Sequence, residues 1–338
     1  MSQDIAFYDA PAASQHISAA KDIYYTPEYG VSAELIDGGN WECAVDMSNG
    51  TFFPYLRRDV SFSATGQYDI VSPYGYGGVC SDGPSGISDF RKKFLKASRD
   101  RGLVAEFVRT NPFDYDTDAV DALGPDEFST HSTFGVGFII NPDEYFTNAE
   151  GRHRTAVRKA GKSGLEVSQH PISVSLDPDS AFRTLYRDTM ERVGAGTRLK
   201  LGTDYFDKLC SVGDEHGFIA EAVDPEGAVL ASSVFLLHGN RVHYHLSGST
   251  PDGQKLGATN LLIDWIVRNH VPPRGLLHLG GGVGSGDGLE KFKRSIASDD
   301  LVVHLCRTVV NRDAYDELCR RAKTPTDTDG YFPAYRAK

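Results

Sequence analysis

Residues 276–297, LLHLGGGVGSGDGLEKFKRSIA, predict a strand, a glycine-rich loop and a helix in direct succession. An apolar run ends in three successive glycines, Gly280, Gly281 and Gly282, and apolar residues return at helical spacing from residue 289. Loops at the carboxyl ends of strands are where α/β sheets place ligand sites, and glycine lets the backbone approach a ligand closely. This order of elements therefore predicts an α/β fold with a ligand site in the loop.

The predicted helix that follows the loop presents positive charge beside the glycines. Its cations are Lys291, Lys293 and Arg294. We expect an anionic group, or a group that becomes anionic during a reaction, to bind there. No register of residues 280–288 matches GxGxxG, and the chain contains no GxxxxGK(S/T), so the dinucleotide fingerprint and the phosphate loop of NTPases are excluded. A tight connection followed by a solvated basic helix is the alternative.

Length and composition indicate a globular protein with two domains. The chain has 338 residues, which is long for a single core, and its 40% hydrophobic and 24% charged residues are ordinary for globular proteins. No apolar run approaches the roughly 18 to 20 residues of a membrane helix, and the polar start lacks a signal-peptide pattern. We expect a cytoplasmic protein without a membrane partner.

Cysteine and histidine usage predicts no metal site. The five cysteines are scattered and free of CxxC spacing, which is typical of reduced thiols. Cys80 follows a glycine-rich turn and is the one candidate for a nucleophile. His243 and His245 share one face of a predicted strand, but a metal pair would need further ligands. Structural roles are favoured for all three.

The net charge of −11 argues against binding of nucleic acid over a long surface. One segment of the chain is nevertheless strongly basic. Residues 151–162, GRHRTAVRKAGK, contain no acidic side chain. The cations of this segment are Arg152, Arg154, Arg158, Lys159 and Lys162. Such a patch can hold a few phosphates while the rest of the surface repels a long polyanion. An ordinary basic helix is the alternative.

The two halves of the chain show the same predicted order of three strands, a helix and a strand. In the first half these elements are residues 41–46, 51–62, 68–72, 87–101 and 103–109. In the second half they are residues 217–223, 229–237, 241–247, 258–270 and 276–279. The repeat predicts a duplicated α/β domain.

The remaining segments are predicted to be mainly helical. Helices are expected at residues 143–162, 177–193, 203–212 and 312–323, and a strand at 301–310. The tail, residues 324–338, either is loosely ordered or packs on the first half. We expect a first domain of residues 1–162, completed by 311–338, and a second domain of residues 163–310.

Eight segments, in order along the chain, match one known family. They are DIYYTPEY (22–29), FFPYLRR (52–58), SPYGYGG (72–78), AEFVRTNP (105–112), RTAVRKAGKSGLEV (154–167), LYRDTMERVGAG (185–196), DYFDKL (204–209) and LLHLGGG with LEKFKRSIA (276–297). In these segments the chain resembles the Fem-like aminoacyl-tRNA-dependent peptidyl transferases. The resemblance implies two tandem GNAT-like (acetyltransferase-like) domains of the α/β (α+β) class, with mixed sheets flanked by helices. Because no sustained heptads occur, we expect no coiled-coil arm.

The resemblance implies that an amino acid passes from charged tRNA to an amine, without a further cofactor. In that reaction an amine attacks an ester carbonyl, and a fixed cation stabilises the oxyanion. The lysine of the family's FK element, here Lys293, is expected to supply that cation. Asn111 stands where many relatives have aspartate, so it can form hydrogen bonds at the site but cannot act as a base.

The resemblance also implies the two binding surfaces. The candidates for contact with the acceptor are Arg57, Arg58, Tyr74, Tyr76, Arg109 and Arg192. The candidates for contact with tRNA are the basic segment 151–162 together with Lys291 and Arg294. The expected partners are the acceptor end of aminoacyl-tRNA and a peptide or peptidyl-nucleoside acceptor, free or bound to a carrier protein.

Several functions remain open at this point. The absence of a coiled-coil arm favours a branch that adds one residue, such as alanine, to a uridyl peptide antibiotic, and a peptidoglycan-precursor acceptor is the alternative. A CoA-dependent N-acyltransferase is another, although residues 254–259, QKLGAT, have Thr259 where the (R/Q)xxGx(G/A) loop requires glycine or alanine. A non-catalytic binding module is the third.

Overall fold

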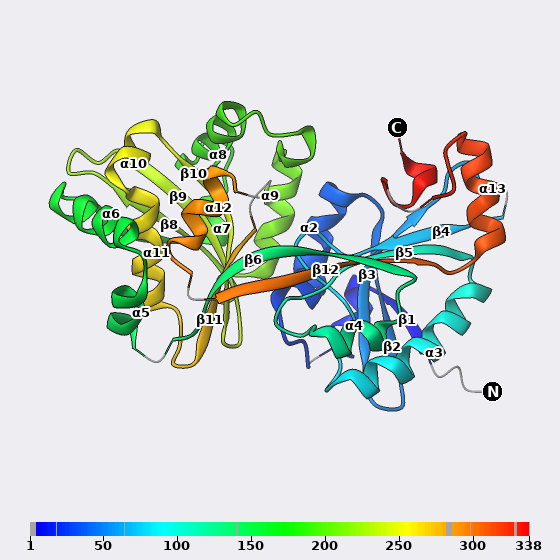
Figure 1. Cartoon of the computed structure of the whole chain (residues 1–338). Coiled ribbons are helices and arrows are strands. Elements are labelled where there is room, and N and C mark those ends of the chain that lie inside the picture. Colours follow the sequence, from blue (N-terminus) through cyan, green and yellow to red (C-terminus); the bar gives the residue numbers. More distant parts are fainter. Residues whose placement is uncertain are drawn as a thin grey trace. The chain divides into compact units, whose positions relative to one another are not determined.

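The computed structural model describes residues 5–17, 19–63, 65–139, 141–281, 286–297, 299–327 and 330–337. The chain forms two compact units (Figure 1). Unit 1 consists of Met1–His131 and Val302–Lys338, and unit 2 of Ser132–Leu301. Unit 2 is thus continuous in sequence, whereas unit 1 is built from two segments.

Unit 1 contains one mixed sheet with helices on both faces. Its strands are β1 (Ile5–Asp9), β2 (Asn40–Asp46), β3 (Phe52–Asp59), β4 (Tyr68–Val71), β5 (Leu103–Arg109) and most of β12 (Asp299–Val309), and they lie in that order. Its helices are α1 (Ala10–Ala13), α2 (Pro27–Asp37), α3 (Pro84–Asp100), α4 (Thr117–Leu123) and α13 (Arg312–Ala322), with short 3-10 turns at Ile23–Tyr25 and Ala334–Arg336. Only β4 and β5 run parallel among the strand pairs described within unit 1.

Two apolar clusters cover the faces of the unit 1 sheet. Helix α3 is amphipathic and contributes Phe90 and Phe94 to a cluster with Phe53 and Tyr55 of β3. On the other face, Tyr315 of α13 packs with the tail residues Phe332 and Tyr335. The described part of the tail therefore packs on the first half, one of the two expected outcomes.

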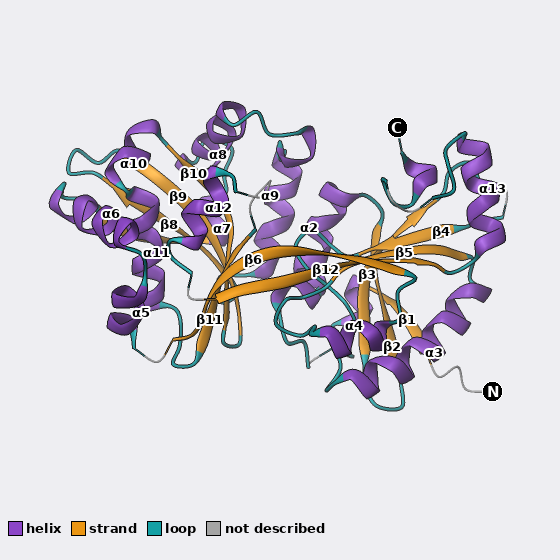
Figure 2. Cartoon of the chain, viewed as in Figure 1, coloured by secondary structure: helices purple, strands orange, loops and turns teal. Residues whose placement is uncertain are grey.

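Unit 2 has the same plan. Its strands lie in the order β6 (Glu127–Ile139), β11 (Gly275–Gly280), β10 (Arg241–Ser249), β9 (Val229–His238), β8 (Gly217–Val223) and β7 (Glu166–Pro171). Its helices are α5 (Pro142–Asn148), α6 (Gly151–Lys162), α7 (Ile172–Ser175), α8 (Ala181–Arg192), α9 (Thr203–Leu209), α10 (Pro251–Leu256), α11 (Ala258–Asn269) and α12 (Gly288–Arg294), with 3-10 turns at Thr197–Leu199 and Cys210–Val212. Figure 2 shows that helices α5, α6 and α11 lie on the opposite side of these strands from α8 and α9.

Helices α11 and α8 pack on opposite faces of the unit 2 sheet. Leu262 and Ile266 of α11 pack with Leu277 and Leu279, because alternate residues of β11 point to the same face. On the other face, α8 lies directly against β10 at Gly248, where a Cβ atom would lie 2.3 Å from the backbone of Leu185. Glycine is therefore required for this close approach.

The predicted order of three strands, a helix and a strand is confirmed in both units, and the strand pairing is also the same. In each unit three antiparallel strands precede a helix and a strand that pairs parallel with the third, as β2–β3–β4–α3–β5 and β8–β9–β10–α11–β11. The single helix expected over residues 143–162 is wrong: α5 ends at Asn148, and α6 begins at Gly151. Ala149 and Glu150 between them have extended ψ angles of 152° and 149°. In the described part of the chain, no helix is long and apolar enough to cross a membrane.

Candidate active site

Lys293 lies on α12 with its side chain almost completely buried. The helix begins after Asp287, whose carboxylate accepts a hydrogen bond from the Glu290 N–H at 2.6 Å and so satisfies a donor of the first turn. Lys293 is 7% exposed, and its Nζ donates to the Gly281 carbonyl oxygen at 2.8 Å. Burial lowers the pKa of Lys293 to about 8, although the Asp287 charge opposes this change. The predicted glycine loop and the predicted lysine are therefore in direct contact.

Other contacts hold the described ends of this loop. The Gly286 N–H donates to Glu290 at 2.7 Å, and Glu290 pairs with Arg294 at 3.1 Å. Arg294 also pairs with Asp300 at 2.8 Å, and its guanidinium lies 4.7 Å from the centre of the Phe134 ring. Its charge is therefore matched by two carboxylates, unlike that of Lys293. Gly282, the third predicted glycine, lies outside the described residues.

The strands β10 and β11 separate close to this lysine. They pair in parallel from Arg241 and Leu276 to His243 and His278, and the described residues beyond show no further pairing between them. A β-bulge follows in β10 between Tyr244 and Leu246, and β11 continues to Gly280, next to the carbonyl that Lys293 contacts. Bulges and separating strand ends are common beside active sites.

In unit 1 the corresponding strands β4 and β5 stay joined. Past Val71 the chain continues to bond to β5, because the Ser72 N–H donates to Phe107 and the Gly77 N–H donates to Arg109, at 3.0 and 2.8 Å. The Asn111 N–H then donates to the Gly77 carbonyl at 2.9 Å. Of the two repeated strand pairs, the one in unit 2 therefore combines a separation of its strands with a buried lysine.

Asn111 is fully buried in unit 1. Its Nδ2 donates to an Asp22 carboxylate oxygen at 3.1 Å, and its Oδ1 accepts from the Phe113 N–H at 3.0 Å. Both ends of the amide thus bind the surrounding chain. The structure places a carboxylate, Asp22, directly beside Asn111, which sequence reasoning missed because the two residues are 89 positions apart.

Three predicted acceptor residues meet at one loop of unit 1. Arg109 donates to the Pro73 carbonyl at 3.0 Å and lies 3.6 Å from the Asp37 carboxylate. Tyr74 and Tyr76 are half-buried on the same loop. The Tyr76 ring packs edge-on against another tyrosine with centroids 5.6 Å apart, and burial raises the pKa of its hydroxyl. The loop therefore presents two tyrosines on a fixed backbone.

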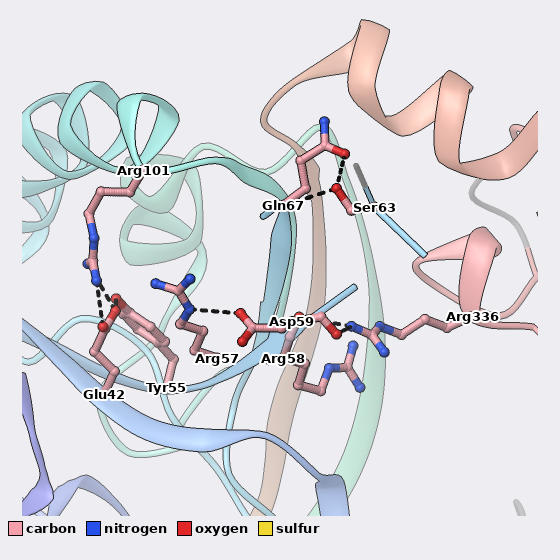
Figure 3. A network of polar contacts seen from close by, with 9 residues as sticks. All are labelled: Glu42, Tyr55, Arg57, Arg58, Asp59, Ser63, Gln67, Arg101 and Arg336. Carbon is pink, nitrogen blue, oxygen red and sulfur yellow. Dashed lines mark hydrogen bonds and ion pairs between the residues drawn. The ribbon is translucent and has the colours of Figure 1, made fainter. Parts of the chain in front are cut away.

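Arg57 and Arg58 bind acidic residues of unit 1 itself. Arg58 pairs with the buried carboxylate of Asp69 at 2.6 Å, and Arg336 of the tail binds the same carboxylate at 2.5 Å. Arg57 lies 4.0 Å over the Tyr68 ring and 3.1 Å from Asp59. Figure 3 shows Arg57 turned toward Asp59 and Arg336 reaching the backbone beside Arg58. Because carboxylates of unit 1 already pair with both guanidinium groups, the acceptor site proposed below does not include Arg57 or Arg58.

The other predicted binding residues lie in unit 2. Arg192 is the last residue of α8 and donates to the Ser249 carbonyl at 2.8 Å. It belongs to unit 2, whereas Arg109 and its loop belong to unit 1. Lys291 is exposed on α12, and its carbonyl accepts from Arg152 at 2.5 Å. The basic segment forms the separate helix α6, with His153, Val157 and Ala160 buried and its cations on the other side.

The segment that resembles a CoA loop is helical. Gln254, Lys255 and Leu256 belong to α10, whose first N–H groups bond to Thr250: its hydroxyl accepts from Gly253 at 2.8 Å and its carbonyl from Gln254 at 3.0 Å. Gly257 has φ +81°, and a Cβ there would lie 2.7 Å from the Ala156 carbonyl of α6. The first N–H groups of α10 are thus satisfied within the chain, and α11 begins at the turn of Gly257.

No metal site is found in the part of the chain that the structure describes. Groups of three or more His, Cys, Asp or Glu side chains that could hold an ion are absent there. His243 and His278 are buried on adjacent strands with rings 5.5 Å apart, and the Tyr205 hydroxyl lies 2.9 Å from His245 Nε2. All five cysteines are free thiols, and burial raises the pKa of several, including Cys43 and Cys306.

The fold and these geometries define a tandem GNAT-like α/β protein. The sequence matches no family model and no curated protein. Among solved structures, the chain is similar to FemX, with a TM-score of 0.70 and 13% identity over 93% of this chain and 99% of that one. It is also similar to the C-terminal domain of a putative lysylphosphatidylglycerol synthetase from Agrobacterium fabrum (TM-score 0.56, 14% identity, 88% and 91% coverage) and to L-PGS from Bacillus licheniformis (0.50, 14%, 87% and 95%). These identities establish a shared fold, and they confirm the Fem-like fold that the sequence resemblance implies.

Proposed function

We propose that this protein is an aminoacyltransferase that forms a peptide bond between an amino acid carried by tRNA and the amine of a peptide acceptor. The observation that supports the proposal is Lys293, a buried cation in contact with the glycine loop where β10 and β11 separate. The fold shared with FemX and with lysylphosphatidylglycerol synthetase domains supports the same class of chemistry.

The residues near the loop suit attack on an ester. The acceptor nitrogen bonds to the ester carbon, and the carbonyl oxygen becomes an oxyanion that Lys293 stabilises by a charge-assisted hydrogen bond. The carbon–oxygen bond to the ribose then breaks. The proton lost by the nitrogen ends on the ribose hydroxyl, so atoms and charges balance. With a pKa of about 8, Lys293 is mainly a cation at pH 7.

For the acceptor, we propose a peptide joined to a nucleoside, and for the amino acid, alanine. The loop of Tyr74 and Tyr76 is the proposed contact, because half-buried aromatic rings can stack on a base and Arg109 fixes the loop backbone through the Pro73 carbonyl. Peptidoglycan-precursor peptides joined to a nucleotide have the same chemical features and belong in the same test. Tyr76→Ala should raise the KM for the acceptor and leave the KM for the aminoacyl ester unchanged.

The test is a transfer assay with purified protein, a pool of radiolabelled aminoacyl-tRNAs and a panel of amine acceptors. We expect RNase-sensitive labelling of one acceptor, lowered about a hundredfold or more in Lys293→Met. Lys208→Met, which removes an exposed lysine of α9 with no assigned binding role, is the matched control. Equal transfer by wild type and Lys293→Met, with both folded, would remove the assigned role. Labelling from acetyl-CoA alone would replace the proposal by a CoA-dependent acyltransferase.

A further inference from the structure

Helix α6 presents a straight row of cations on its exposed side. Arg154, Arg158 and Lys162 are spaced four residues apart, so each lies about 6 Å beyond the last along the axis. Like charges at this spacing destabilise a helix, and Arg154 also lies near its positive N-terminal end. The helix contains no acidic residue that would relieve the repulsion. Stability of the helix therefore does not explain this arrangement.

Among the residues that the structure describes, no carboxylate pairs with these side chains. Arg154 donates to the Thr147 carbonyl, and Lys159 donates to the Lys255 carbonyl at 2.7 Å. The Arg158 guanidinium lies 5.5 Å from the centre of the Phe146 ring. Carbonyl oxygens and a ring fix the direction of a cation without cancelling its charge, whereas a carboxylate would cancel it.

Several other cations of unit 2 pair with carboxylates. Arg268 pairs with Asp143 and Asp264, both at 2.9 Å. Arg294 pairs with two acids, as described above, and Arg152 pairs with Glu150 at 2.8 Å. The structure thus divides the predicted tRNA-binding residues into two sets. Arg152 and Arg294 belong to the matched set. The others have no carboxylate partner among the described residues: Lys291 on α12, and Arg154, Arg158, Lys159 and Lys162 together on α6.

We propose that the exposed face of α6, through Arg154, Arg158, Lys159 and Lys162, binds the phosphate backbone of the tRNA acceptor arm. The inference rests on the proposed function for the identity of the RNA. A row two helical turns long suits a few successive phosphates, and the acidic remainder of the chain limits the contact to this face. Because phosphate contacts do not read bases, the surface holds the arm of any tRNA and does not select the amino acid.

The binding test uses uncharged tRNA as the probe, with fluorescence anisotropy at 50 to 200 mM KCl. The variant is Arg158→Gln with Lys162→Gln. The matched control is Arg320→Gln with Arg321→Gln, which removes two exposed cations of α13 that pair with Glu317. Each lost phosphate contact should lower the salt slope by about 0.7 to 0.9, so the α6 variant should lose about 1.5. Over this fourfold salt range, the affinity of wild type should then fall about eightfold more than that of the variant.

Equal slopes for wild type and the α6 variant would overturn the proposal, as would equal losses in the α6 and α13 variants. Vesicles containing anionic lipid serve as a second probe. If the α6 variant loses vesicle binding and keeps tRNA binding, the surface contacts a membrane and the proposal is wrong.

A transfer assay separates this inference from the proposed function. With an aminoacylated RNA minihelix, the α6 variant should show a raised KM and an unchanged kcat. With a short aminoacyl ester that lacks the duplex, it should equal wild type. A raised KM with the short ester as well would refute the phosphate contact while the transfer reaction stands. If wild type transfers from neither substrate, the proposed function fails and the binding result is judged separately.

Discussion

Replacing Lys293 by methionine should stabilise unit 2 at neutral pH while it stops transfer. Burial lowers the pKa of Lys293 from 10.5 to about 8, so keeping the side chain charged in the fold costs about 3 kcal/mol at about 1.36 kcal/mol per pKa unit. Loss of the hydrogen bond to Gly281 offsets about 1 to 3 kcal/mol of this gain. We expect Lys293→Met to be about 1 kcal/mol more stable than wild type at pH 7.

The pH dependence is the sharper part of this prediction. The folded pKa lies below the unfolded one, so between about pH 8 and 10.5 the unfolded state binds more protons and wild-type stability rises with pH relative to the variant. From pH 7 to 9.5 the stability difference between the two proteins should change by about 2 kcal/mol in favour of wild type. Below pH 8 it should be nearly constant.

Urea unfolding can report unit 2 alone. The chain has two tryptophans, Trp41 in unit 1 and Trp265 in unit 2. In a Trp41→Phe background, fluorescence therefore follows unit 2, and Lys291→Met in the same background is the control for removal of an exposed lysine of α12. A Lys293→Met protein that is less stable at pH 7, with a difference from wild type that does not change with pH, would refute the reasoning.

Three further outcomes are expected. Lys293→Arg should move the loss of kcat/KM above pH 8 to higher pH, because arginine stays cationic where Lys293 loses its proton; an unchanged pH profile would show that Lys293 does not act as a cation. Asp69→Asn should destabilise unit 1 by about 3 kcal/mol, seen by Trp41 fluorescence, because Arg58 and Arg336 lose their shared carboxylate. Its control, the exposed pair member Asp59→Asn, should cost less than about 1 kcal/mol, and equal effects would contradict the assignment. Acetyl-CoA should leave the Tm unchanged, since Thr259 stands where the CoA loop requires glycine or alanine, and a clear rise would count against this.

Much of the fold could be predicted because its signals are local. Turn residues between short runs of β-branched and aromatic side chains located β8, β9 and β10 to within about two residues, a good result for element boundaries. Three strands were missed, β1, β6 and β7, as were the helices α1, α2, α4, α7 and α10. The sequence of β6, EFSTHSTFGVGFI, contains little regular alternation, and pairing with distant strands decides its conformation.

The candidate site could be predicted only in part. The type and place of Lys293 followed from the family resemblance, but its burial depends on the packing of α12 and the loop. The partners of Arg58 could not be predicted, because Arg336, which shares the Asp69 carboxylate, lies 278 residues further along the chain. Sequence spacing shows which cations exist, whereas the positions of distant carboxylates decide which of them remain available for a ligand.

The continuity of unit 2 within a divided unit 1 has a consequence for synthesis of the protein on the ribosome. Domains generally fold as the chain emerges, at about 5 to 20 residues per second. Residues 132–301 can close on themselves as soon as they are complete, and Thr133 near one end already contacts the Leu301 carbonyl at the other, at 3.4 Å. Residues 1–131 must wait for β12, α13 and Arg336. The half with the earlier sequence is therefore the later to finish folding, and its exposed sheet faces are where a chaperone would be needed in the interval.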